Sequence, residues 1–400
     1  MLSLDMHNAN LKLIREKHAQ LDKLLPKLNA DAWLIPCREE NDRAAPLLAG
    51  FDTIGETILI FTRKGKKIAI VTDYDQQDAR ATGVYDEVIP CSKGFAKPLR
   101  ETIASLNLKT FAMNFSEDDA LMDGLSYGLL LRLKKLLDLP DFESRLVSSQ
   151  SILEPLRAQK SPEEIRRIRE AIRITETILK EVDAFIRPGM SERQIVTFIK
   201  ERQREHGTSS SFGDGANVMA GRYGIGHRSA TDKPITPGDT LLIDIGCYYG
   251  GYTSDIQRAY YFLDKEDDAP ARVKKRFKVG QTAMHMAISA IKPGKRGYEI
   301  DAIARYYQEE NGITPFPHAL GHQIGRTIHD GGSLLAPIGP RYGQRGNVPL
   351  EVDEVYTVEP VVHGHTDKEG CPIGVEQDVL ITETGAEVLS TPQDQLILVG

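Results

Sequence analysis

The sequence is poor in the residues and runs that mark secreted, membrane-spanning or nucleic-acid-binding proteins. Its four cysteines lie far apart and form no CxxC pair, which excludes a zinc ribbon or a disulfide-stapled scaffold and favours a reducing cytoplasm. No apolar run reaches the ~18 residues of a membrane span, and the N-terminus lacks the apolar core of a signal peptide. With 50 basic against 57 acidic residues, the net charge of −7 argues against nucleic acid as a partner.

What the sequence does contain is enough apolar material for two domains. It is 40% apolar and 27% charged, as in soluble globular proteins, and its 400 residues exceed the ~100–200 that are usual for one domain. Residues 1–152 alternate helical patterns with short runs rich in Ile, Val and Thr, which predicts an α/β domain. The absence of a GxGxxG or Walker A motif leaves a nucleotide site without support. The expected strands are 31–37, 56–62, 66–72, 86–91 and 110–115.

A second domain, residues 153–400, is expected to begin with a long helix whose start is clearly marked. Ser161 fits the N-cap position and Pro162 the first helical position, and Glu164 completes a capping box. The pattern predicts that this helix ends near Ile186, before a Pro-Gly break.

This second domain contains an internal repeat. The segment Ile-Arg-Pro-Gly at Ile186 recurs without gaps 105 positions later as Ile-Lys-Pro-Gly at Ile291, and each copy is a helix, a Pro-Gly break and a second helix. We therefore expect two similar halves that face each other; the alternative is two unrelated helix pairs that share a common stop signal. Each copy also leads into an apolar hairpin, formed by 238–246 with 251–262 and by 353–360 with 373–382.

Each hairpin carries two carboxylates in otherwise apolar strands, Asp244 and Asp255 in the first and Glu359 and Glu376 in the second. A buried ionised carboxylate is strongly disfavoured unless it is paired or binds a metal. If Gly250-Gly251 form the first hairpin's loop, Asp244 faces Gln257 and shares a sheet face with Asp255, close enough for both to hold one ion. For either hairpin taken singly, the alternative is two acids on a solvated sheet face.

Histidines gather near the second hairpin, at His318, His322 and His329, with His227 upstream. Two histidines four apart are typical of zinc-binding helices, but Ala319 stands where a zincin has Glu, and the glycines argue against a regular helix. One imidazole with four carboxylates is an oxygen-rich set that favours Mn²⁺ or a similar ion over a thiolate-type zinc site. For His318, an ordinary surface or core position is the alternative.

As a set, these residues resemble the pita-bread catalytic domain of the creatinase/aminopeptidase metallohydrolase family, which includes Xaa-Pro aminopeptidases, prolidases and methionine aminopeptidases. The resemblance extends over residues 155–400. It implies a pita-bread domain with a pseudo-twofold repeat behind a creatinase-like α/β domain, as in the prolidase, aminopeptidase P and creatinase branch. The motifs that carry it are Asp244 and Asp255, eleven apart; His322 in a Gly-His element, seven before His329; Glu359 in TVEP; Glu376 in VEQD; and His227, seventeen before Asp244.

The resemblance also implies a site for two divalent ions, expected to be Mn²⁺, with Co²⁺, Zn²⁺ or Fe²⁺ as alternatives. Asp244 would bind one ion. Asp255 and Glu376 would bridge both ions. His322 and Glu359 would complete the second. A hydroxide that bridges the two ions would then attack the amide carbonyl near neutral pH.

Catalytic and substrate-binding roles follow from the same resemblance. Glu359 would carry the proton of the attacking water to the leaving amine. His227 and His329 would hydrogen-bond the scissile region of the substrate. His318 would be a nearby substrate-binding residue.

Five positions depart from the pattern of proline-specific members: Ala319, Arg326, His363, Gln257 where Thr or Ser is common, and Gly374 where Arg is common. They leave the expected metal ligands intact and change what surrounds them. The leading hypothesis is a metallopeptidase that cleaves the Xaa-Pro bond of a dipeptide or of a peptide N-terminus. The alternatives are a metal-dependent hydrolase of a small-molecule C–N bond and a non-catalytic module that binds peptides or proteins.

The expected partners are a peptide or small amide substrate and a second copy of the chain, with no nucleic acid and no membrane. The family resemblance implies a homodimer in which the N-terminal domain of one chain closes over the active site of the other. The segment 37–43 is a candidate contributor to that site, with a solvated charged loop as the alternative. Trp33, the single tryptophan, is expected in the core.

Overall fold

The structure is a computed structural model that describes residues 4–39, 41–213, 215–221, 228–363 and 372–400. The chain divides into two compact units. The N-terminal unit consists of Met1–Arg157 with Ser161–Glu163, and the C-terminal unit of Ala158–Lys160 with Glu164–Gly400. Among the described helices, none is long and apolar enough to cross a membrane.

The N-terminal unit is built on a six-stranded mixed sheet in the order β4-β3-β2-β1-β5-β6. β1, β2 and β3 pair antiparallel, whereas β4, β5 and β6 are added in parallel. The five strands predicted from the sequence are present as β1 to β5, and β6, just before the predicted second domain, was not predicted. The strands are β1 Ala32–Cys37, β2 Thr57–Thr62, β3 Lys67–Val71, β4 Glu87–Pro90, β5 Phe111–Met113 and β6 Leu146–Ser148.

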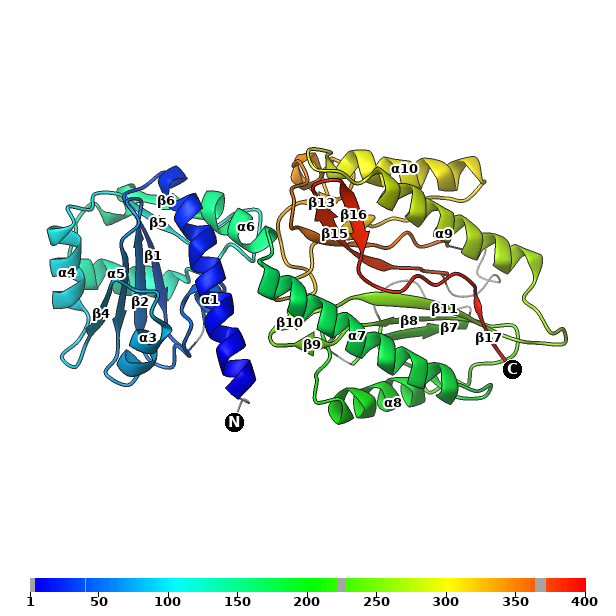
Figure 1. Ribbon diagram of the computed structural model, residues 1–400. Helices are drawn as coiled ribbons and strands as arrows, with labels where there is room; N and C mark the ends of the chain where they lie inside the picture. Colours follow the sequence, from blue (N-terminus) through cyan, green and yellow to red (C-terminus); the bar gives the residue numbers. More distant parts are fainter. Residues whose placement is uncertain (1–3, 40, 214, 222–227, 364–371) are drawn as a thin grey trace. The chain divides into compact units, whose positions relative to one another are not determined.

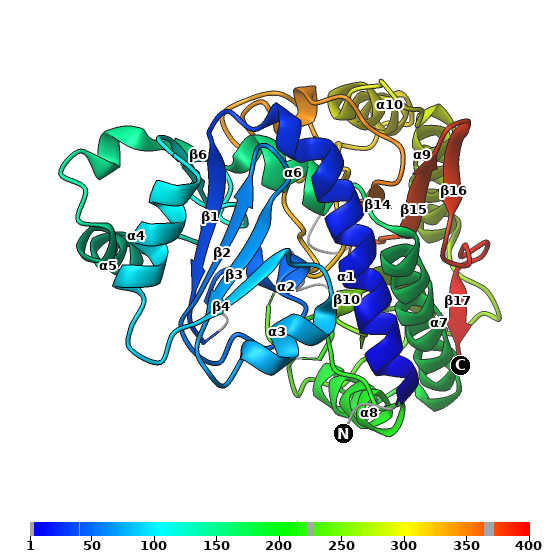
Figure 2. The same cartoon turned by 60° about the vertical axis from the view of Figure 1, so that its left-hand side comes forward.

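Helices cover both faces of this sheet because its central strands are apolar on both sides. One face packs against α4 and α5, and the other against α1, α2 and α6. Figure 1 shows α4 and α5 on the side of the sheet away from α1 and α6, and Figure 2 also labels α2. Trp33 is buried on the face with α1, as predicted. The helices are α1 Leu4–Leu24, α2 Ala45–Leu48, α3 Gln76–Thr82, α4 Ala96–Ser105, α5 Tyr127–Leu137 and α6 Gln150–Ala158, with 3₁₀ turns η1 Leu25–Lys27 and η2 Phe142–Arg145.

The C-terminal unit carries two helix pairs that repeat with the spacing of the sequence. They are α7 Pro162–Phe185 with α8 Glu192–Glu205, and α9 Ala271–Ala290 with α10 Gly297–Glu310. α10 starts and ends 105 residues after α8. The breaks within the pairs contain Gly189 and Gly294, at φ of 89° and 84°, a backbone conformation that favours glycine. The predicted internal repeat is confirmed.

Strands lie between the two helix pairs of this unit (Figure 1). One sheet has the order β17-β11-β8-β7 and another β14-β15-β16, and β9 with β10 and β12 with β13 form two short ribbons. The two predicted hairpins are β8 with β11 and β14 with β15. The strands are β7 Asn217–Ala220, β8 Thr240–Ile245, β9 Tyr248–Tyr249, β10 Tyr252–Thr253, β11 Ile256–Phe262, β12 Gly321–His322, β13 Leu334–Leu335, β14 Val355–Val358, β15 Gln377–Thr382, β16 Gly385–Val388 and β17 Ile397–Val399, with the turn η4 Arg345–Asn347.

Candidate metal centre

The first hairpin places Asp244 and Asp255 on one face of its sheet. β8 and β11 pair antiparallel with Asp244 opposite Gln257. β9 pairs with β10 around Gly250-Gly251, so the predicted loop and the predicted register are both confirmed. Asp255 precedes Gln257 by two residues. Because side chains alternate between faces along a strand, Asp255 shares the face of Asp244.

The second hairpin places Glu359 and Glu376 at the same end of two neighbouring strands. Glu359 follows the last residue of β14, and Glu376 precedes the first residue of β15. The residues next to them in the hairpin, Val358 and Gln377, face each other. The backbone N–H of Glu359 donates a hydrogen bond to the carbonyl of Leu320, two residues before His322, over 2.8 Å. The second hairpin and the histidine segment are therefore linked at this point.

The five residues expected to bind metal come together from these elements. Carboxylate oxygens of Asp244, Asp255 and Glu376 all lie within 4.8 Å of one another. His322 Nε2 lies 3.6 Å from Oδ2 of Asp255 and 3.2 Å from Oε1 of Glu359. Asp244, Asp255, His322 and Glu376 are buried and Glu359 is half-buried, so four carboxylates and one imidazole share a site largely closed to solvent.

Burial and mutual repulsion disfavour the charged form of three of these carboxylates. Burial, with the charge of Glu359, raises the pKa of Asp244 to about 8. Burial and the neighbouring carboxylates also raise the pKa values of Asp255 and Glu376 well above their usual range. Glu359 differs: burial would raise its pKa, but the hydrogen bond and charge of His322, the charge of His318 and the hydrogen bond of Thr357 together lower it. Without a cation the cluster cannot carry its full negative charge.

Several oxygens of the cluster have no hydrogen-bond partner among the residues that the structure describes. Oδ1 of Asp244, Oδ1 of Asp255 and both carboxylate oxygens of Glu376 are buried without a hydrogen bond to any residue that the structure describes. Buried polar atoms are nearly always satisfied in native proteins, so these atoms require a ligand. Carboxylate oxygens with one imidazole are the donors that Mn²⁺ and similar divalent ions prefer. The residues present therefore fit divalent metal.

The other predicted site histidines lie around this cluster to different extents. The ring of His329 contacts that of His322 edge-on, with centroids 4.4 Å apart, and His329 is exposed. His318 is half-buried, with its ring 5.3 Å from that of Phe316. His227 lies outside the described residues. Of the positions that depart from the family pattern, Arg326 lies over the ring of Tyr252 at 5.6 Å, in the first hairpin.

Two buried charged residues beside the cluster were missed in the sequence. Asp378 is fully buried, and its Oδ2 accepts a hydrogen bond from the backbone N–H of Asp255 over 3.3 Å. Arg258 donates to the carbonyl oxygens of Gln257 over 2.8 Å and Glu376 over 3.4 Å, and so joins the two hairpins. The signal for Asp378 was its spacing of two from Glu376, which places both side chains on one face of the strand.

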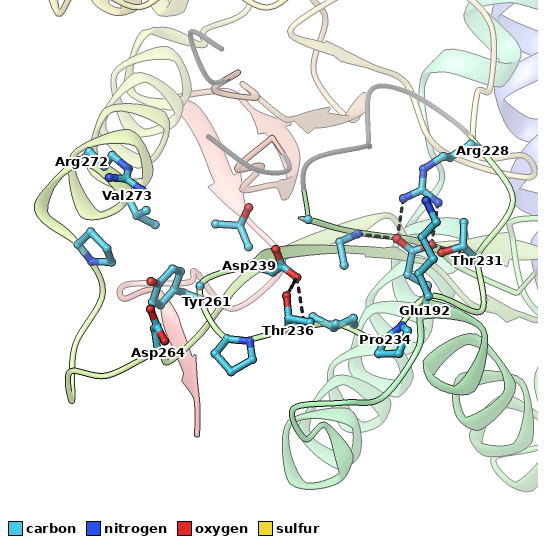
Figure 3. A pocket seen from close by; sticks show the side chains of 18 residues that line it. Glu192, Arg228, Thr231, Pro234, Thr236, Asp239, Tyr261, Asp264, Arg272 and Val273 are labelled. Atoms are coloured by element: carbon cyan, nitrogen blue, oxygen red, sulfur yellow. Dashed lines mark hydrogen bonds and ion pairs between the residues drawn. The ribbon is translucent and has the colours of Figure 1, made fainter. Parts of the chain in front are cut away.

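A cavity of about 610 Å³ lies at the start of β8, toward the opposite end of that strand from Asp244 (Figure 3). Glu192, the first residue of α8, is buried and its side chain lines the wall of this cavity. It accepts hydrogen bonds from the backbone N–H groups of Ala220 over 2.7 Å and Thr231 over 2.8 Å, and from the guanidinium of Arg228 over 2.6 and 2.7 Å. One carboxylate thus fixes residues on both sides of the segment 222–227, which contains His227.

The chain is similar in sequence to a known peptidase family and to a curated peptidase. Residues 166–383 match the model of metallopeptidase family M24. The chain is 27% identical over 386 residues to the uncharacterized peptidase YqhT of Bacillus subtilis. The aligned region covers 96% of this chain and 99% of that protein.

Two solved structures resemble the whole chain. The X-Pro aminopeptidase from Thermotoga maritima superimposes with a TM-score of 0.76 at 27% identity, covering 93% of this chain and 99% of its own. The Xaa-Pro dipeptidase from Bacillus anthracis superimposes with a TM-score of 0.78 at 25% identity, covering 96% and 100%. These likenesses confirm the predicted fold class, an N-terminal α/β domain followed by a pita-bread catalytic domain.

Proposed function

The chain belongs to metallopeptidase family M24, a family of metal-dependent peptidases, and from this membership we propose that it is a binuclear enzyme that hydrolyses the Xaa-Pro bond of a dipeptide or of a peptide N-terminus. The observation that carries the proposal is the cluster of buried carboxylates with unpartnered oxygens beside His322. A non-catalytic binding module has no need of such a cluster, because buried unpaired acids cost stability.

We assign five ligands to two ions. Asp244, Asp255, His322, Glu359 and Glu376 would hold them. The mutual distances of three of the carboxylates and the position of His322 next to Asp255 and Glu359 support this assignment. Mn²⁺ is the proposed metal because the donors are oxygen-rich.

The residues of the chain divide the chemical work among them. Bound divalent ions would lower the pKa of a water and stabilise negative charge on the attacked carbonyl. As a carboxylate, Glu359 can accept the proton of the attacking water and then pass it to the leaving nitrogen. His329 is exposed beside His322, where it can donate a hydrogen bond to the substrate carbonyl. We assign the same task to His227, and substrate contact to His318.

Relatives support the Xaa-Pro part of the proposal. The solved structures from Thermotoga maritima and Bacillus anthracis are named as an X-Pro aminopeptidase and an Xaa-Pro dipeptidase. We further propose a homodimer in the cytoplasm. The second candidate function, hydrolysis of another small amide, is favoured by one observation: the side chain of Gln257 occupies the space beside Gly374 where proline-specific members commonly carry Arg.

A substrate panel with metal analysis tests the proposal. Metal-free protein is reconstituted with Mn²⁺, its metal content is measured by elemental analysis, and it is assayed on Xaa-Pro dipeptides and tripeptides beside the matching Xaa-Ala peptides. We expect about two ions per chain and hydrolysis of the Xaa-Pro series. Hydrolysis of a different amide with the Xaa-Pro peptides left intact would favour the second candidate. Failure to bind any ion would contradict both.

A further inference from the structure

Gln257 contacts the proposed proton acceptor from the opposite hairpin. The side chain is 5% exposed, and its Nε2 donates a hydrogen bond to Oε2 of Glu359 over 3.0 Å. The other oxygen of the same carboxylate, Oε1, accepts a hydrogen bond from the hydroxyl of Thr357 over 3.2 Å and lies 3.2 Å from Nε2 of His322. Glu359 is thus held at both oxygens, and Gln257 supplies the contact at Oε2.

The carboxylate also determines which way the Gln257 amide points. A carboxylate accepts hydrogen bonds and donates none, so the amide nitrogen must face Glu359 and the amide oxygen must point away. That oxygen, Oε1, points toward Gly374. It is buried and has no hydrogen-bond partner within the part of the chain that the structure describes. Among the described residues, the amide is therefore held through its nitrogen alone.

Gly374 provides the space that this orientation needs. A Cβ at position 374 would lie 2.3 Å from Oε1 of Gln257 and 3.0 Å from Cδ1 of Leu242. Real Cβ atoms essentially never approach an atom to 2.3 Å, so one of the two groups would have to move, and the end of the Gln257 side chain is the more flexible. Gly374 is not among the glycines with positive φ, so its backbone does not itself require glycine. The missing side chain of Gly374 leaves space that the amide oxygen of Gln257 occupies.

We propose that Gln257 is a positioning residue that holds Glu359 in place, and that Gly374 keeps open the space without which Gln257 cannot reach it. The two residues act as one unit, so two departures from the family pattern have a single physical cause. A side chain at position 374 would displace the amide of Gln257, and a shorter residue at 257 would leave room for that side chain. The inference rests on the proposed role of Glu359 and adds the residues that orient it.

A double-mutant cycle tests the unit. Gln257→Ser, Gly374→Ala and the double variant are compared with the parent protein in Mn²⁺ affinity, measured by calorimetry on metal-free protein, and in kcat and KM on the preferred peptide. Residues that orient metal ligands typically change affinity or activity by about 10–100-fold when lost, and we expect a loss of this order from each single variant. Because the proposed role of Gln257 acts through Glu359, kcat should fall with little change in KM. The double variant should be no worse than Gln257→Ser alone, since the displaced amide is already gone.

Two further measurements separate this proposal from its alternatives. Gly280→Ala is the matched control: Gly280 is a buried glycine without positive φ whose Cβ would lie 3.2 Å from Val362, and the change should leave affinity and kcat at the parent values. The same cycle in the unfolding free energy of metal-free protein should also be non-additive, because the clash needs no metal. Losses that multiply in the double variant, or parent-like behaviour of Gly374→Ala, would overturn the proposal. A parent protein that binds no Mn²⁺ would instead contradict the metal site, while the metal-free cycle would still decide whether Gln257 and Gly374 are coupled.

Discussion

Asp42 in the N-terminal unit and Asp244 in the C-terminal unit are both buried aspartates, but they differ in how many hydrogen-bond donors surround them. Oδ1 of Asp42 accepts hydrogen bonds from the backbone N–H of Ala44 over 2.8 Å and from Nδ2 of Asn114 over 2.9 Å. Oδ1 of Asn114 in turn accepts from the indole N–H of Trp33 over 2.7 Å and from the hydroxyl of Ser149 over 2.6 Å. Within the N-terminal unit, this network supplies donors for the buried carboxylate.

The C-terminal cluster has the opposite balance of donors and acceptors. Its carboxylates face one another, and several of their oxygens have no donor among the described residues. Burial is similar in the two units, so burial alone does not identify a functional acid. The difference is whether the protein itself supplies the compensating donors. A buried acid to which the protein supplies hydrogen-bond donors is part of the core. A buried acid without such donors needs a bound cation to compensate its charge.

The strongest way to break this comparison is Asp244→Asn. Loss of a ligand should abolish binding of at least one ion and lower hydrolysis about a thousandfold, because metal assistance contributes several kcal/mol and each ~1.4 kcal/mol is tenfold in rate. The metal-free variant should be more stable than the metal-free parent near neutral pH, since Asn avoids the cost of holding protonated a buried carboxyl that ionises in the unfolded chain. Elemental analysis, peptide assays and urea unfolding check the three effects. Asp267→Asn, at an exposed acid of the same unit, is the control; parent-like activity of Asp244→Asn would contradict the ligand assignment.

The reverse result is expected at Asp42. Asp42→Ala should lower the stability of the N-terminal unit by about 3 kcal/mol, because the amide of Asn114 and the N–H of Ala44 lose their acceptor in a buried site. Metal content should stay at the parent value. Urea unfolding followed by tryptophan fluorescence reports on this unit, since Trp33 is the single tryptophan of the chain. Asp52→Ala, at an exposed acid of the same unit, serves as the control. If Asp42→Ala lost bound metal and kept its free energy of unfolding, Asp42 would be a functional acid like Asp244.

The sequence predicted that these carboxylates lie together because its signals are local and periodic. Two acids per apolar hairpin, a repeat of 105 residues and a two-residue loop place Asp244 opposite Gln257 by counting alone. The sequence could not predict which acids the protein satisfies, because that depends on contacts between distant residues. Asn114 reaches Asp42 across 72 positions, and Gln257 reaches Glu359 across 102. The reason for Gly374 is likewise visible only once Gln257 is seen beside it.

The smallest expected effect is a difference in pH response between the two units of the metal-free protein. Burial is the main reason that the pKa of His18 falls to about 4. The unfolded chain therefore takes up the proton first, and the N-terminal unit loses stability as the pH falls from ~6.5 toward ~4. Burial, then the charge of Glu359, raises the pKa of Asp244 to about 8, so the folded C-terminal unit holds that proton and loses stability as the pH rises from ~4 toward ~8.

Over the shared window near pH 4–6.5, the two units should therefore respond with opposite signs, each by at most about 1.4 kcal/mol per pH unit for one proton. Trp33 fluorescence during urea unfolding follows the N-terminal unit, and hydrogen exchange of the β8 and β11 amides follows the C-terminal unit. His18→Gln should flatten the first dependence and Asp244→Asn should reduce the second, each without changing the other. Added Mn²⁺ should reverse the second dependence, because binding requires the carboxylates to lose their protons. Equal signs in both units would mean that His18 does not set the pH response of the N-terminal unit or that Asp244 does not set that of the C-terminal unit.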